Sequence, residues 1–337
     1  MHGHHETNTL PLLPPRFMPG ADIRWGVFRT ADGTALRWAY RPCPNARAAC
    51  LLVGGFGEFA EKYFETMADL SARGFAVWFV DWRGQGGSAR SFPNPARPRP
   101  RDFDRDVADL AAFANHHLPE HARRVVVGHS MGAAIALLAM AQRPDLFDAA
   151  VLSAPMLGIV THPVPAWMAP AVATVAASCG FADAFAPSCG PWDAEAQIAA
   201  SNRATHDPVR ATVQQAWCHA APRLRVDGPT YGWVHAAFGL MDRLADPDLL
   251  RLVRAPVLLG CPMEDTCVDP IAIQRAAMAL PKAELALFAT ARHELFMEAD
   301  SIRGRWFGAM ETFLAPILGQ SRGRVTRAPQ RVLSLVV

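Results

Sequence analysis

Short runs of apolar residues alternate with longer amphipathic segments along most of the chain. The apolar runs are nearly continuous, as in strands of a parallel sheet that is buried on both faces. They lie at Ala49–Val53, Ala76–Val80, Arg124–Val127, Ala149–Leu152, Val257–Leu259 and Glu284–Phe288. This alternation predicts an α/β fold with a mostly parallel, doubly wound sheet.

Other segments of the chain have helix and hairpin patterns. In Asp102–Leu118 the apolar residues recur at helical spacing behind an aspartate suited to capping the first turn. Gly132–Ala141 is a run rich in Ala and Leu. Near the start of the chain, Asp32-Gly33 separates the short runs Ile23–Arg29 and Ala35–Tyr40, which predicts a β-hairpin.

The alternation stops between about Pro155 and Leu250, where no strong strand pattern occurs and Pro, Ala, Trp and Met are frequent. We expect a helical insertion there that covers the sheet as a cap. The predicted organisation is an N-terminal extension at 1–22, a core at 23–155 and 251–319, a helical cap at 156–250 and a basic tail at 320–337. The tail holds several arginines and no acid, and we expect it to lack regular structure.

Composition and charge exclude several classes of protein. The 337 residues are 51% hydrophobic, which excludes intrinsic disorder, and the net charge of +2 gives no general affinity for nucleic acid. The chain shows no secretory signal and no uninterrupted apolar run of about 18 residues. Seven scattered cysteines favour free thiols. We therefore expect a cytoplasmic protein, with peripheral attachment to the inner membrane and the oligomeric state left open.

The strongest chemical signal is Gly128-His129-Ser130-Met131-Gly132, which lies between a predicted strand and a predicted helix. This is the sequence context of a nucleophile elbow. Glycines on both sides of the serine relieve crowding at a sharp strand-to-helix turn, which leaves the hydroxyl exposed. We predict that Ser130 is the catalytic nucleophile.

An elbow of this kind requires an acid and then a histidine later in the chain. His293 is the only histidine after Val257–Leu259, and it directly follows the last predicted strand. The acid should lie just after the preceding strand, where Asp265 is our choice and Glu264 the alternative. Ser130 would attack an acyl carbon, His293 would accept and return its proton, and Asp265 would orient the imidazolium.

The donors to a developing oxyanion should come from two backbone N–H groups. One follows the nucleophile directly, at Met131. Gly54-Gly55-Phe56-Gly57 follows the strand Ala49–Val53 and lets backbone amides approach a ligand closely. We predict that the N–H groups of Phe56 and Met131 form the hole, with a plain glycine-rich turn as the alternative.

Several motifs resemble known hydrolases. Asp81-Trp82-Arg83-Gly84-Gln85-Gly86-Gly87-Ser88 resembles the D-x-R-G-x-G-x-S signature of monoglyceride-lipase-like α/β hydrolases, and Gly-His-Ser-Met-Gly and Ala-Arg-His-Glu-Leu match that group. Other segments are similar to bacterial lysophospholipases: Glu58-Phe59 with Glu61-Lys62-Tyr63, Phe79 to Gly87, Ser153-Ala154-Pro155-Met156 and Gly228-Pro229-Thr230-Tyr231-Gly232-Trp233.

The resemblance runs from about Ile23 to Leu318. It implies an α/β-hydrolase fold with a helical cap, and it implies the same triad and the same two N–H donors by position. The chain departs from the family pattern at Gly54, where relatives often carry His. A backbone donor does not need that side chain. We expect Asp81 and Arg83 to bind neighbouring loops rather than to act in catalysis.

Together these features predict a serine hydrolase that cleaves the carboxylic ester of a single-chain lipid. A lysophospholipid is the first choice, and a monoacylglycerol or the substrate of another carboxylesterase is the second. A serine peptidase and a non-catalytic binding protein are lower alternatives. No G-x-G-x-x-G at a strand end and no P-loop occurs, so we predict no cofactor. We predict no metal either, because His2, His4 and His5 lack a further ligand cluster.

Two further sets of residues are left with alternatives. Arg97, Arg99 and Arg101 alternate with prolines in Ser91–Arg101, which predicts an extended, exposed loop. Solvated charges are the favoured interpretation, and a phosphate headgroup or an anionic bilayer is the alternative. The large apolar residues of the cap either line an acyl pocket or form the core of the cap itself. They are Trp167, Met168, Trp192, Trp217, Trp233 and Phe238.

Overall fold

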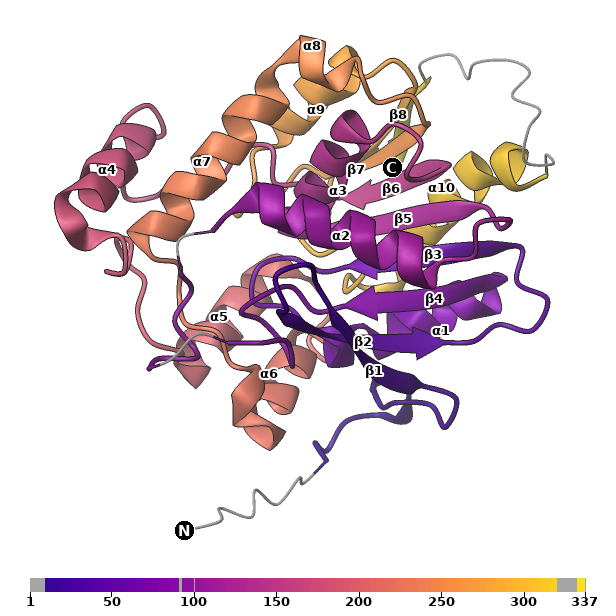
Figure 1. Cartoon of the computed structure of the whole chain (residues 1–337), viewed down its shortest axis with the longest axis horizontal. Helices are drawn as coiled ribbons and strands as arrows, with labels where there is room; N and C mark the ends of the chain where they lie inside the picture. The colour runs from indigo at the N-terminus through magenta and orange to yellow at the C-terminus, as the bar shows by residue number, and fades with distance from the viewer. Residues whose placement is uncertain (1–9, 91–92, 100, 320–331, 337) are drawn as a thin grey trace.

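The computed structural model describes residues 10–90, 93–99 and 101–319 and the backbone of 332–336. Within these residues the chain forms a nine-stranded sheet with helices on both faces (Figure 1). The strands are β1 (Arg24–Arg29), β2 (Ala35–Arg41), β3 (Ala48–Val53), β4 (Phe75–Val80), β5 (Arg124–His129), β6 (Ala149–Ser153), β7 (Val257–Pro262), β8 (Ala283–Phe288) and β9 (Val332–Val336).

The strand order is β1-β2-β4-β3-β5-β6-β7-β8-β9. Strands β3 to β9 are parallel to one another, whereas β2 is antiparallel to both β4 and β1. This confirms the predicted α/β fold, and every strand run predicted from the sequence forms a strand with small shifts at its ends. The carboxyl ends of the parallel strands therefore share one edge, which is where sites in such sheets are built.

The prediction of a tail without regular structure is wrong for 332–336. These residues form β9, which pairs in parallel with β8. The sequence Val-Leu-Ser-Leu-Val is rich in strand-forming residues, and β8 would otherwise offer a row of unpaired backbone groups. The arginines of the tail lie in 320–331, outside the described residues, as do His2, His4 and His5.

Different helices cover the two faces of the sheet and form two hydrophobic cores. The helices are α1 (Phe64–Ala72), α2 (Phe103–His117), α3 (Ser130–Gln142), α4 (Ala169–Ala176), α5 (Ala194–Ala204), α6 (Arg210–Ala220), α7 (Tyr231–Ala245), α8 (Pro247–Leu250), α9 (Pro270–Ala279) and α10 (Asp300–Leu318). One core contains residues of α2, α3 and α9, and the other contains residues of α1 and α10. Leu51 of β3 packs into the first core and Leu52 into the second, because side chains alternate along a strand.

Between β6 and β7 the chain forms α4 to α8 and no strand longer than an isolated bridge, and this stretch is described throughout. Figure 1 shows α4, α5 and α6 grouped to one side of the sheet. The helical character of this inserted segment, residues 156–250, agrees with the sequence. Its boundaries as a cap domain stay a prediction.

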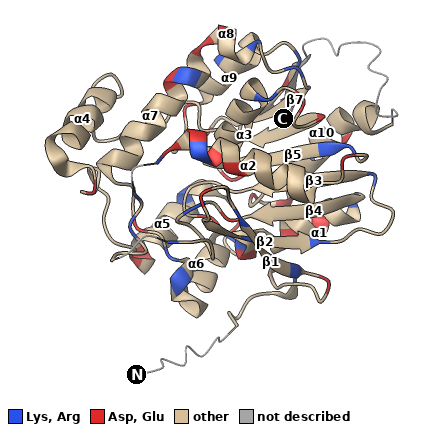
Figure 2. Ribbon diagram, in the orientation of Figure 1, with Lys and Arg blue, Asp and Glu red and all other residues tan. Residues whose placement is uncertain are grey.

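Charged residues are spread over many elements, with Lys and Arg close to Asp and Glu (Figure 2). The expectation of an exposed arginine loop holds only in part among 93–99 and 101. Pro98 is buried and the Arg101 side chain is 9% exposed, because Arg101 forms an ion pair with Asp106 of α2. None of the helices in the described residues has both the length and the apolar character needed to cross a bilayer.

Arg210 anchors the inserted segment to the core. It is buried at the first position of α6, and its guanidinium donates two hydrogen bonds of 2.8 Å to Glu65 of α1. It also binds Asp207 at 2.6 Å and Asp300 of α10 at 2.6 Å. A single cation thus joins α1, α6 and α10.

We expect Arg210→Met to lower the free energy of unfolding by about 3 kcal/mol, because it leaves buried Glu65 without its hydrogen-bonded cation. The loss should fall at the low end of such effects, since Arg303 stays 3.7 Å from Glu65. Urea unfolding measures it. The control is Arg251→Ala, which removes an exposed pair with Asp248 and should cost less than about 1 kcal/mol. Equal losses in the two variants would contradict the anchor.

Candidate active site

Ser130 lies at the turn from β5 into α3, in a backbone conformation that residues other than glycine seldom adopt. Its φ is +50°, in the left-handed region. A Cβ on Gly128 would lie 2.8 Å from the Cα of Ala133, and one on Gly132 would overlap the carbonyl oxygen of Gly54. The glycines predicted to relieve crowding are therefore required by the geometry. The helix itself begins at Ser130, two residues earlier than the sequence pattern indicated.

The loop after β3 packs directly against this elbow. A Cβ on Gly55 would lie 3.1 Å from the Cβ of Ser130, so the backbone of this loop approaches the Ser130 side chain closely. Met131 is the second residue of α3, and the first N–H groups of a helix have no acceptor within the helix. The positive end of α3 therefore points at this junction. The structure thus brings the segments of Phe56 and Met131 together beside Ser130.

Two side chains of the Asp81–Ser88 loop hold the Gly54-Gly55 segment in place. Trp82 donates its Nε1–H to the carbonyl oxygen of Gly54 at 2.8 Å, and Gln85 Nε2 donates to that of Gly55 at 3.0 Å. The sequence analysis missed both residues. Their position inside the D-x-R-G-x-G-x-S motif is the one signal that could have suggested them.

Asp81 and Arg83 bind neighbouring segments, which are not only the expected loops but also strand β2 and helix α2. Asp81 accepts hydrogen bonds from Arg37 at 2.6 Å and from the N–H of Ala60 at 3.0 Å. Arg83 bridges Asp32 of the β1–β2 turn, at 2.6 Å, and Asp109 of α2. These contacts make the loop a fixed support for the segment that follows β3.

His293 and Asp265 meet beyond the ends of β8 and β7. His293 Nδ1 and Asp265 Oδ2 are 2.7 Å apart. The other Asp265 oxygen accepts hydrogen bonds from the N–H groups of Cys267 at 2.7 Å and Val268 at 3.0 Å, which fixes the carboxylate. The His293 ring also lies 4.7 Å, centroid to centroid, from that of His129, the residue before Ser130.

The alternative acid, Glu264, does not contact His293. Its side chain is 52% exposed and lies 3.8 Å from His206. Asp269 caps the first turn of α9 instead. Of the carboxylates considered from the sequence, Asp265 is therefore the partner of His293.

The pair has shifted proton affinities. Burial of the ring opposes protonation of His293, but the adjacent Asp265 carboxylate outweighs it, so the pKa of His293 is raised. Burial likewise opposes ionisation of Asp265, yet the His293 charge and the three hydrogen bonds hold its pKa below the usual value. The geometry gives an imidazole whose Nδ1 side is occupied by a carboxylate and which is poised to accept a proton.

A buried ion chain connects the two loops of the site, and the sequence analysis did not assign it. Lys62 Nζ donates to Glu58 Oε1 at 2.6 Å and to Glu294 Oε1 at 2.8 Å. Glu58 also accepts a hydrogen bond from the N–H of Gly55 and one of 2.6 Å from Tyr63. Burial alone would raise the pKa of Glu58, but the Lys62 ammonium holds it at about 2.

Two groups of side chains in the described residues have the chemistry of metal ligands, and both belong to this site. In one, Glu58 and Glu294 flank the Lys62 ammonium, which already supplies the positive charge between them. The other comprises Asp265, Cys267 and His293, in which Asp265 binds His293 and the N–H of Cys267 at 2.7 Å each. Contacts within the chain account for both groups.

The aromatic residues of the inserted segment have different environments. Trp217 and Trp233 are buried in the two hydrophobic cores. The Trp233 ring lies 4.5 Å from that of Phe56, centroid to centroid. Trp167 is 82% exposed, which fits neither of the two interpretations from the sequence, a residue that lines an acyl pocket or one in the core of the cap.

A family model described as "Serine aminopeptidase, S33" matches residues 44–300, which is more than half of the chain. The chain belongs to this family of α/β hydrolases. Among curated proteins it is similar to lysophospholipase L2 of Escherichia coli strain K12, with 38% identity over 176 residues. That match covers 51% of each chain, so the chain spans about half the length of this relative.

Two further likenesses extend the comparison. The chain is 26% identical to a probable lysophospholipase L2 of Haemophilus influenzae over 83% of its own length and 88% of the relative's. A crystal structure of a soluble monoglyceride lipase variant from Saccharomyces cerevisiae, in complex with a substrate analogue, has a TM-score of 0.69 at 20% identity. It covers 91% of this chain and all of that one, and it supports the fold.

We expect Asp265→Asn to lower the pKa of His293 from its raised value, because burial of the ring then acts against only the weaker attraction of Glu294 and Glu58. An NMR titration of the imidazole nitrogens measures this. Glu264→Gln is the matched control and should leave the pKa unchanged, since Glu264 lies near His206 instead. An equal shift in both variants would show that Asp265 is not the dominant partner.

Proposed function

We propose that this protein is a serine hydrolase that cleaves the carboxylic ester of a single-chain lipid, with a lysophospholipid as first substrate. The observation that carries the proposal is the His293–Asp265 pair held beside the strained Ser130 elbow. The lysophospholipase names of relatives in Escherichia coli and Haemophilus influenzae support the lipid assignment. An odd, scattered set of seven cysteines favours action in the cytoplasm.

In the proposed reaction Ser130 Oγ attacks the ester carbon while His293 accepts its proton. The carbonyl oxygen becomes an oxyanion, which the N–H groups of Phe56 and Met131 stabilise. His293 then protonates the leaving glycerol oxygen, and an acyl-serine forms. Water, deprotonated by His293, releases the fatty acid and restores the serine. Because His293 must be neutral to act as base, activity falls as the pH falls through its raised pKa.

A monoacylglycerol is the alternative substrate, and the name of a 31% identical relative, the rat monoglyceride lipase, supports it. The family description also includes aminopeptidases. An aminopeptidase needs an acidic group for the amino terminus of its substrate. The described cavity beside Phe56 is instead lined by twice as many arginines as aspartates, which favours an anionic or neutral substrate.

We expect Ser130→Ala to lower the rate of fatty-acid release from lysophosphatidylethanolamine by on the order of 10⁴-fold or more. A fluorophosphonate probe should label the wild type and not the variant. Ser301→Ala, at an exposed position of α10, is the control and should keep both properties. Labelling of Ser130 without release from lysophospholipid or monoacylglycerol would contradict the lipid substrate and leave the nucleophile intact.

We expect Gly132→Ala to lower kcat by about 10²-fold, because the added methyl group overlaps the carbonyl oxygen of Gly54 and separates the two donor segments. Steady-state kinetics on the preferred lipid measures it, beside a thermal unfolding curve. Gly308→Ala in α10 is the control, since nothing lies within 4 Å of the added carbon there. Unchanged kcat in a folded Gly132→Ala would argue against the hole.

A further inference from the structure

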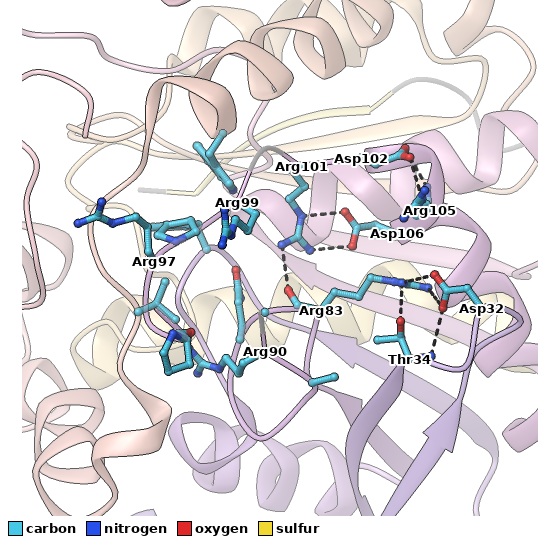
Figure 3. A pocket seen from close by; sticks show the side chains of 18 residues that line it. Asp32, Thr34, Arg83, Arg90, Arg97, Arg99, Arg101, Asp102, Arg105 and Asp106 are labelled. Carbon is cyan, nitrogen blue, oxygen red and sulfur yellow. Dashed lines mark hydrogen bonds and ion pairs between the residues drawn. The ribbon is translucent and has the colours of Figure 1, made fainter. Parts of the chain in front are cut away.

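A cavity of about 420 Å³ opens beside the segment that follows β3 (Figure 3). Phe56 and Trp233 line part of it, and Gln85, which holds the carbonyl oxygen of Gly55, lines another part. The remaining wall is unusually basic, with six arginines and three aspartates. The cavity therefore shares Phe56 with the proposed oxyanion hole and adjoins the place where the ester would lie.

Most of these arginines already have carboxylate partners. Arg83 is paired with Asp32 and Asp109. Arg101 makes a two-pronged contact with Asp106, at 2.7 and 2.8 Å, as the dashed lines in Figure 3 show. These pairs neutralise the side of the cavity formed by α2 and the β1–β2 turn.

Arg90 has a different environment. Its two terminal nitrogens donate to four backbone carbonyl oxygens, those of Gly86, Pro95, Arg223 and Arg225, at 2.8 to 3.0 Å. These contacts hold the guanidinium in place but bring no negative charge, and its buried Nε has no hydrogen-bond partner in the described structure. Burial lowers the pKa of Arg90, and the attraction of Asp81 and Asp227, which form no ion pair with it in the described structure, does not offset that cost.

Two further arginines add positive charge at the same end of the cavity. Arg97 lies over the ring of Phe185, 4.3 Å from its centroid, and no carboxylate among the described residues forms an ion pair with it. Arg99 is paired with Asp183 at 3.0 Å, but both side chains are about half exposed. An exposed pair contributes little, so an incoming anion can compete with Asp183 at small cost.

We propose that this cavity is an anion subsite that takes the phosphate of the lysophospholipid headgroup while the ester lies against the Phe56 loop. The inference rests on the proposed function and specifies its substrate. Arg90 supplies a fixed positive charge, and Arg97 and Arg99 supply guanidinium donors, which bind phosphate oxygens strongly. The glycerol backbone places the phosphate a few bonds from the ester, which fits a cavity that shares Phe56 with the hole.

The test compares lysophosphatidylethanolamine with monoacylglycerol of the same acyl chain, both below their critical micelle concentrations so that no charged surface forms. We expect the double variant Arg97→Gln/Arg99→Gln to lose on the order of 10-fold or more in kcat/KM on the lysophospholipid, mainly through KM. Its kcat/KM on monoacylglycerol should change by less than about twofold. Equal losses on both substrates, or no loss, would overturn the subsite.

The matched control is Arg143→Gln/Arg251→Gln, which removes the same charge away from the cavity. Arg143 ends α3 at the far side from Ser130, and Arg251 is an exposed partner of Asp248, as Arg99 is of Asp183. The control should keep both activities. A loss on the lysophospholipid as large as that of the cavity variant would attribute the effect to net charge and overturn the proposal.

Inorganic phosphate separates a headgroup site from a site for free phosphate. Calorimetry measures phosphate binding to the wild type and to the Arg97→Gln/Arg99→Gln variant. If the variant loses phosphate binding but keeps the wild-type preference between the two lipids, the headgroup assignment is overturned. Wild-type activity on monoacylglycerol alone would instead refute the lysophospholipid part of the proposed function, and the headgroup assignment with it. If the wild type cleaves the lysophospholipid and the Arg97→Gln/Arg99→Gln variant has the same kcat/KM on it, only the subsite is refuted.

Discussion

The Lys62 ammonium is buried between two carboxylates, and the geometry of the whole site depends on it. Lys62 lies 2.6 Å from Glu58 and 2.8 Å from Glu294. Without this cation the buried Glu58 carboxylate and the partly buried Glu294 carboxylate would both lose their positive partner, which is costly in a protein interior. Glu58 in turn accepts the N–H of Gly55, and Glu294 is the neighbour of His293. The orientation of the Phe56 loop and the position of the proposed base are thereby coupled through one side chain.

The same charges also set the protonation of the two histidines at the elbow. Glu58 and Glu294 add to the effect of Asp265 in raising the pKa of His293. His129, which is equally buried, has its pKa lowered to about 3, because burial outweighs the attraction of Glu58. One imidazole is thus kept neutral as a packing element while the other takes protons readily. The difference arises from a direct carboxylate hydrogen bond, which His293 has at 2.7 Å and His129 lacks in the described structure.

Local patterns were sufficient for strands β1 to β8 and for the elbow, because each depends on residues close together in sequence. The candidate triad followed from the chain order that such an elbow requires, together with the position of the last histidine after β8. They left Asp265 and Glu264 as alternatives, since the choice depends on the turn in which Cys267 and Val268 donate to Asp265. The Lys62–Glu294 pair joins residues far apart in the chain, so no local period could indicate it. The strand at 332–336 was missed for a related reason: its pairing depends on the free edge of β8.

Phe56 is where the proposed chemistry, the inserted segment and the basic cavity meet. Its N–H belongs to the loop beside Ser130, its ring lies against Trp233 of α7, and its side chain lines the cavity. A headgroup bound by Arg97 and Arg99 would therefore lie in the same cavity as the residue that we propose as a donor to the ester carbonyl. Binding energy gained at a distant, non-reacting group can then serve to position the reacting bond. In the proposed arrangement, recognition of the headgroup and stabilisation of the oxyanion would both depend on the same short loop, whose Gly55 N–H is bound by Glu58 of the Glu58–Lys62 pair.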